Sequence, residues 1–132
     1  MDTSKLLPWV AKTLDQPNTG DNPINRGQCV GLVEAWLDLL GKPHIPGNAK
    51  DLLSNSQGLD AYKQTINAPV NYPQAGDIIV WGPTWGAGYG HTAVVLAANI
   101  NHVVVFEQND PAGSPPIVGT HDYSGVLGWI SW

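Results

Sequence analysis

The chain has 132 residues, of which 42% are hydrophobic and 13% charged, and its formal net charge is -5 at pH 7. This length suits one apolar core, and we expect residues 1–132 to form a single catalytic domain. The acidic balance argues against a nucleic-acid-binding protein, which needs a basic patch. The longest apolar runs, 93–98 and 103–106, are too short to span a membrane.

The only cysteine, Cys29, excludes an internal disulfide framework and a zinc site built from cysteines. Residues 1–8 lack the apolar segment of a signal peptide. We therefore expect a protein that stays where it is made, leaves the cell by another route, or comes from a longer chain.

The first predicted helix covers residues 3–14, with Thr3 or Ser4 as its N-cap. Pro8 is compatible with this helix if it lies in the first turn. Residues 15–27 follow as a loop that is dense in turn-forming residues.

The strongest helical pattern lies within residues 25–41. Its apolar side chains recur every three or four residues, and a second set widens the stripe: Val30, Val33, Leu37 and Leu40, then Leu32, Trp36 and Leu39. We expect a central helix that is buried on most sides, that leaves Glu34 and Asp38 for solvent, and that ends at Gly41 in a left-handed cap.

Cys29 lies in the first turn of this helix. The first N–H groups of a helix have no helical partner and the helix dipole is positive there, so both favour a thiolate over a thiol. The alternative is a buried structural cysteine, because free cysteines are among the most buried residues.

The second half of the chain changes from helix to strand. A short helix is predicted over 48–55, with Asn48 as its N-cap, and 56–74 is expected to be irregular. After Gly76 the pattern predicts strands separated by turns, at 77–81, 91–98, 103–109, 117–120 and 126–132. Helices followed by an antiparallel meander predict an α+β fold with the helices on one face of the sheet.

Strand register places a histidine beside polar side chains. If 91–98 and 103–109 form a hairpin through the turn at 99–102, His91 lies opposite residue 110, to within about two residues. Glu107 and Asn109 are two residues apart on one strand, so they should share a face. The sequence thus predicts a His–Glu or a His–Asn pair.

This pair matches what a cysteine nucleophile requires. A histidine withdraws the thiol proton and later protonates the leaving amine, and a third group orients the imidazole. The helix N-terminus supplies N–H groups for an oxyanion hole, which the Gln28 side chain could assist if it does not face solvent. Taken separately, His91 could be a structural histidine, and Glu107 and Asn109 could simply mark a strand end.

Five motifs occur in a specific order: Gly27-Gln28-Cys29-Val30, residues 75–81, Gly90-His91-Thr92, Phe106-Glu107-Gln108-Asn109 and residues 127–130. In combination they resemble the CHAP domain, the cysteine- and histidine-dependent amidohydrolase/peptidase family. The resemblance covers nearly the whole chain.

The resemblance implies a papain-like α+β fold, in which N-terminal helices pack on an antiparallel sheet, and cleavage of an amide bond in peptidoglycan. It also implies roles for four residues. Cys29 would be the nucleophile, His91 the general base and acid, and Glu107 the group that orients His91, while Asn109 would complete the site.

Some endolysins of this family bind calcium in the loop before the cysteine and at the second residue after it. Here that later position is Gly31, and the loop offers only Asp21, Asn22 and Asn25. Calcium takes six to eight oxygen ligands, so one carboxylate is too few. We expect neither calcium nor another cofactor.

The glycine-rich loop at 82–90 could form one wall of a substrate groove through Trp85 and Tyr89. Trp85 could equally fill the core. His121-Asp122 could mimic a base and its orienting group, but we expect them in a loop with no strand to aim them.

We interpret the chain as a peptidoglycan hydrolase, either an N-acetylmuramoyl-L-alanine amidase or a stem or cross-bridge endopeptidase, that acts as a monomer. As a phage endolysin or virion-associated lysin it would be made in the host cytoplasm and act on the wall; otherwise it would be secreted within a longer chain. Two alternatives are a catalytically silent domain that binds wall peptides and a cysteine amidase that acts on a small soluble amide.

Overall fold

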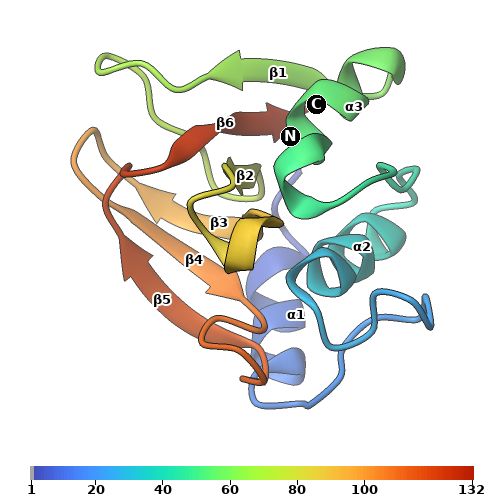
Figure 1. Cartoon of the computed structure of the whole chain (residues 1–132). Coiled ribbons are helices and arrows are strands. Elements are labelled where there is room, and N and C mark those ends of the chain that lie inside the picture. Colours follow the sequence, from blue (N-terminus) through green and yellow to red (C-terminus); the bar gives the residue numbers. More distant parts are fainter. Residues whose placement is uncertain (1) are drawn as a thin grey trace.

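The computed structural model describes residues 2–132 and shows a six-stranded antiparallel sheet with its helices gathered on one side (Figure 1). The helices are α1 (Leu6–Thr13), α2 (Cys29–Leu39) and α3 (Leu52–Asn55). The strands are β1 (Lys63–Ile66), β2 (Ile78–Trp81), β3 (His91–Ala98), β4 (Val103–Glu107), β5 (Ile117–His121) and β6 (Val126–Ser131), in the spatial order β1-β6-β2-β3-β4-β5. The predicted α+β, papain-like fold is confirmed.

The two faces of the sheet build two apolar clusters, because successive residues of a strand point to opposite faces. Ile78 and Val80 of β2 pack against the helices, together with Val94, Phe106 and Ile130. Ile79 and Trp81 belong to a second cluster with side chains of β3, β4 and β6. The sheet is therefore buried on both faces around its central strands.

Helix α2 is fixed to the sheet at its middle. Trp36 is fully buried, and its indole N–H donates to the Gly76 carbonyl at 3.0 Å, just before β2 begins. Trp9 of α1 packs against both Trp36 and Phe106, with ring centroids 5.3 Å apart in each case. These contacts hold α2, and with it Cys29, in a fixed place against the sheet.

Several helix predictions need correction. Helix α1 begins only at Leu6, after Lys5 rather than after a Thr3 or Ser4 cap. The helix expected over 48–55 is a 3-10 turn, Ala49–Asp51, followed by the short α3, and no cap hydrogen bond from the Asn48 side chain occurs within the described chain. Gly41 does adopt the expected left-handed conformation, with φ of 69°.

The burial of α2 also differs from the expectation. Glu34 is only 5% exposed because Asn25 and His44 bond its carboxylate, whereas Leu39 is partly exposed at the helix end. The apolar periodicity of a helix predicts that its polar residues face solvent. It contains no information about hydrogen-bond partners that come from other segments and allow a polar residue to be buried.

Strand predictions were correct for the central hairpin and incomplete at the edges. Strand β1 was missed, since its sequence is mostly polar and it pairs with β6 at the edge of the sheet. Strand β4 ends at Glu107 because Asn109 has a positive φ of 66°, so the shared-face argument does not extend to Asn109. Among residues 2–132, no helix has the length and apolar character needed to cross a membrane.

Candidate active site

Cys29 is the first residue of α2 and is half-buried. The chain reaches it through Gly27, whose φ of 82° suits glycine, and through Gln28, whose backbone is extended. The structure thus places the thiol at a helix N-terminus, as the sequence predicts.

Gln108 fastens the segment that leads to Cys29. It is fully buried just after β4, and its side-chain oxygen accepts from the Thr19 N–H at 2.9 Å. Its amide nitrogen donates to the carbonyl of Gln28 at 2.8 Å and to that of Thr19 at 3.1 Å. Gln108 belongs to the Phe106–Asn109 motif, but the motif alone indicates no role for it. Its three hydrogen bonds join the end of the strand that carries Glu107 to the segment that leads to Cys29.

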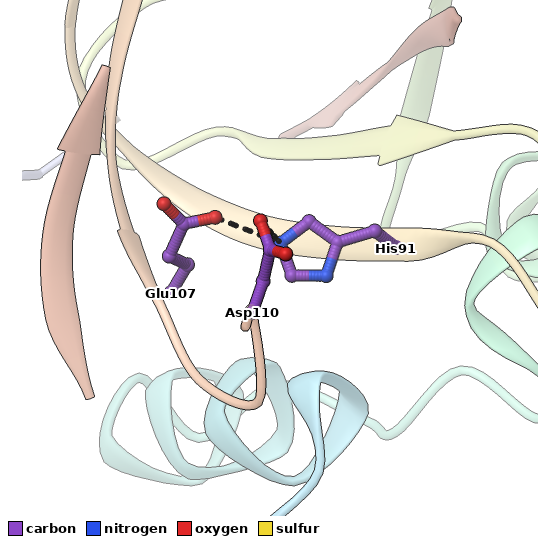
Figure 2. A group of neighbouring side chains, drawn as sticks. All are labelled: His91, Glu107 and Asp110. Carbon is purple, nitrogen blue, oxygen red and sulfur yellow. Dashed lines mark hydrogen bonds and ion pairs between the residues drawn. The ribbon is translucent and has the colours of Figure 1, made fainter. Parts of the chain in front are cut away.

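His91 opens β3 and is 3% exposed. Its Nε2 lies 2.9 Å from Glu107 Oε1, as Figure 2 shows, and the Cys29 side chain is near enough to raise the pKa of the imidazole. With Nε2 directed at Glu107, Nδ1 is the nitrogen left for the thiol. The three side chains therefore form one chain of contacts, from the start of α2 through β3 to the end of β4.

The pKa of His91 is the balance of opposing effects. Burial lowers it, but the interactions of the imidazole with the Cys29 and Glu107 side chains raise it to about 9. The imidazolium is thus the favoured form at neutral pH.

The predicted hairpin register is nearly correct. Ala98 faces Val103, as a tight turn requires, but an irregularity between Val95 and Ala97 shifts the pairing so that Val94 faces Phe106. The shift is one residue, within the expected uncertainty, and Glu107 rather than Asn109 is the residue bonded to His91.

Glu107 also bonds a second histidine. His121 Nε2 lies 3.0 Å from Oε1 and 2.9 Å from Oε2 of the carboxylate. Burial raises the pKa of Glu107, but the hydrogen bonds from His121 and His91 outweigh it, and the pKa lies below its usual value. The expectation that no strand aims His121 is wrong, because β5 extends to His121 and pairs with β4 throughout.

Trp85 and Tyr89 have different places around the site. The Trp85 ring stacks on His91, with centroids 5.9 Å apart and planes 14° apart, and it also packs on Trp81. Trp85 is thus a partner of the histidine rather than a residue of the cleft wall. Tyr89 is 63% exposed and lines the cleft.

The cleft has a volume of about 440 Å³, and Cys29 and His91 lie in its wall. Gln28, which is an exposed residue, and Tyr89 line it, and the other lining residues include Ile24, Asn25, Asn48 and Asn109. A larger hollow of about 670 Å³ lies beside Asp77, and it shares no lining residue with this cleft.

Asn109 lines the cleft, but no hydrogen bond within residues 2–132 joins it to His91. Its side-chain oxygen accepts from the Gly113 N–H at 2.6 Å, within the loop that follows β4. The structure therefore places Asn109 beside the Cys29–His91 pair and engages it in local loop structure.

The metal-binding potential of the site is limited. In residues 2–132, one group of three possible ligands has suitable spacing, His91, Glu107 and Asp110 (Figure 2), and its closest pair is already hydrogen-bonded. The loop before Cys29 holds the position that the sequence analysis considered for calcium. A Cβ at Gly31 would overlap the Asn25 carbonyl oxygen, and Asp21 is an exposed, lone carboxylate.

A cysteine at the start of a buried helix, with a histidine and a carboxylate on neighbouring antiparallel strands, defines the papain-like class of α+β domains. The chain belongs to the CHAP domain family, whose model matches residues 18–109. That range begins in the loop before Cys29 and ends at Asn109.

The relatives include phage lysins. The chain is 37% identical over 116 residues to endolysin PlyTW of Staphylococcus phage Twort. The matched region covers 78% of this chain and 24% of that protein. Endolysin LysIME-EF1 has a similar structure, with a TM-score of 0.74 and 26% identity over 95% of this chain and 61% of that one. An N-acetylmuramoyl-L-alanine amidase from Staphylococcus aureus shares the fold, with a TM-score of 0.65 and 20% identity over 99% of this chain and 40% of that one. The chain thus spans about a quarter of the curated relative.

Proposed function

We propose that this domain hydrolyses an amide bond of bacterial peptidoglycan with Cys29 as the nucleophile. The observation that carries the proposal is the contact chain Cys29–His91–Glu107 at the wall of an open cleft. The endolysin relatives support the substrate class. The bond cut is either the N-acetylmuramoyl-L-alanine amide or a peptide bond of the stem or cross-bridge.

The first half of the reaction forms an acyl-enzyme. The Cys29 thiolate attacks the carbonyl carbon, and the oxygen becomes an anion that N–H groups at the start of α2 and the Gln28 amide, which lines the cleft, can stabilise. The His91 imidazolium gives its proton to the amine nitrogen as the C–N bond breaks. The amine leaves, and the acyl group remains on sulfur as a thioester.

The second half restores the enzyme. Neutral His91 takes a proton from water, the resulting hydroxide attacks the thioester, and the C–S bond breaks to release a carboxylic acid. Glu107 accepts the hydrogen bond from Nε2 throughout, which keeps Nδ1 directed at the thiol and stabilises the imidazolium.

We propose that this chemistry needs no metal or other cofactor and that the domain works as a monomer. The Gln108 hydrogen bonds and the close packing of Asn25 on Gly31 support this proposal, because they connect the loop before Cys29 to the rest of the domain. By analogy with PlyTW, the domain would act on the wall as the catalytic part of a phage lysin.

The test is mass spectrometry of purified peptidoglycan digested with the wild-type domain and with Cys29→Ala. New amino termini that appear only with wild type support the proposal, and their identity separates amidase from endopeptidase. Equal products from both proteins would contradict the cysteine mechanism. Absence of new termini on every wall type tested would favour a soluble amide substrate or a binding role.

A further inference from the structure

The Glu107 carboxylate is held from two sides. His91 of β3 bonds Oε1 at 2.9 Å, and His121 of β5 approaches both oxygens, at 3.0 Å and 2.9 Å. Among the described residues no other hydrogen bond reaches this carboxylate, so His121 is the only partner of Oε2. Glu107 as a whole residue is 2% exposed, which leaves water little access to its side chain.

Strand β5 also shapes the space around this carboxylate. A Cβ at Gly119 would overlap Oε2, so the absence of a side chain there makes room for it. His121 is itself held by aromatic rings, because its ring meets Trp81 and Trp85 edge-on at 5.3 Å and 5.2 Å. Two β5 residues, Gly119 and His121, thus fix where the Glu107 carboxylate can lie.

We propose that His121 is a positioning residue, which fixes the Glu107 carboxylate so that Oε1 faces His91. The proposal rests on the proposed function, in which Glu107 orients His91. A glutamate side chain has several rotatable bonds, and a single hydrogen bond would leave its carboxylate free to turn. The second histidine removes that freedom without contacting the thiol or the substrate cleft.

Other charged groups surround the pair. Asp110 lies 4.0 Å from His91 Nε2 on the loop after β4. On the side of β5, exposed Asp122 interacts electrostatically with His121 and His102. A histidine donates from Nε2 both as the cation and as the Nε2–H tautomer, so His121 can hold Glu107 in either charge state.

The test compares His121→Phe with His121→Gln. Phenylalanine keeps the ring against Trp81 and Trp85 but has no donor, whereas glutamine can place an N–H near the original Nε2. We expect kcat to fall by roughly tenfold in His121→Phe, with KM little changed and with partial recovery in His121→Gln. His102→Gln, at an exposed turn histidine, is the matched control.

A direct readout distinguishes positioning from a purely structural role. In NMR titrations of the imidazole resonances, the pKa of His91 should fall by about one unit in His121→Phe, because the carboxylate turns away. An unchanged or higher pKa would overturn the proposal, since it would mean that His121 has no influence or competes with His91 for Glu107.

Gly119→Ala provides an independent route to the same displacement with His121 intact, and it keeps the proposal testable if His121→Phe does not fold. It should lower both kcat and the pKa of His91, and normal values of both would contradict the proposal. The titration needs no substrate, so it still decides the role of His121 if no wall is hydrolysed and the proposed function fails.

Discussion

The molecule contains two buried glutamates that each bond a histidine, and they differ in what lies next to them. Glu107 connects His91 to His121, and His91 continues to Cys29 at the wall of the cleft. Glu34, on α2, bonds Asn25 at 2.9 Å and pairs with His44 at 2.9 Å.

The Glu34 cluster ends at the surface. His44 pairs through its second nitrogen with exposed Asp38 at 2.7 Å, so both ring nitrogens face carboxylates and neither is available to a nucleophile. A buried Glu–His pair is therefore no sign of catalysis by itself. The pair becomes an active-site candidate when the second imidazole nitrogen meets a thiol at a cleft.

The largest expected effect separates these two glutamates by activity. Glu107→Gln should lower the rate of wall hydrolysis by about 10²–10⁴-fold, since an amide carries no negative charge to stabilise the His91 imidazolium and its NH₂ group would replace one of the two acceptor oxygens. Glu34→Gln should leave the rate within about twofold, because Glu34 bonds Asn25 and His44 rather than His91, and a glutamine oxygen can still accept from Asn25. Release of soluble wall fragments measures both. Equal losses of hydrolysis rate in the two variants would mean that the two glutamates do not differ in their importance for activity.

The pH dependence of stability should come from His91, which is bonded to Glu107, rather than from the Glu34 cluster. The pKa of His91 is raised to about 9, so its contribution to stability is fully present below the unfolded value near 6.5 and is lost as pH rises through about 9. The expected loss is about 1–3 kcal/mol in the free energy of unfolding. The pH-dependent loss should disappear in His91→Gln, as urea unfolding at pH 6, 7.5 and 9.5 would show. Persistence of the full loss in that variant would assign it to other groups.

The Glu34 cluster should matter for stability instead. Glu34→Gln weakens the contact between a buried carboxylate and the His44 ring, and about 1 kcal/mol of unfolding free energy should be lost. Thermal unfolding at neutral pH measures the change. His44→Gln is the companion variant and should lower the melting temperature by a similar amount. A variant with unchanged melting temperature would show that the cluster contributes nothing measurable.

The same two glutamates show how far sequence reasoning reaches. The Cys29 helix and the His91 strand could be predicted, since both follow from strong periodicity and clear turn signals. Glu107 was placed within reach of His91 because a tight turn fixes hairpin register. Glu34 was misplaced in solvent, because its partners Asn25 and His44 come from segments without regular structure.

His121 and Gln108 could not be predicted for related reasons. Strand β5 joins β4 across a long, proline-containing loop, so no turn fixes its register, and Gly119 weakens its strand pattern. Gln108 acts through side-chain bonds to a loop 80 and 89 residues away in the sequence. Such contacts depend on tertiary packing that neither propensity nor spacing encodes.

The smallest expected effect concerns the loop that the Glu34 cluster helps to hold. Asn25 donates to Glu34 through its side chain, and its carbonyl oxygen packs on Gly31, where a side chain would collide. We propose that these contacts hold the loop by themselves, so EDTA should change neither the melting temperature nor the hydrolysis rate. Calcium added back in excess is the control, and it should also have no effect. A fall in activity with EDTA that calcium restores would mean that an ion, rather than the Asn25–Glu34 bond, organises the approach to Cys29. It would also make Glu34 part of the functional site and so remove the difference between the two glutamates.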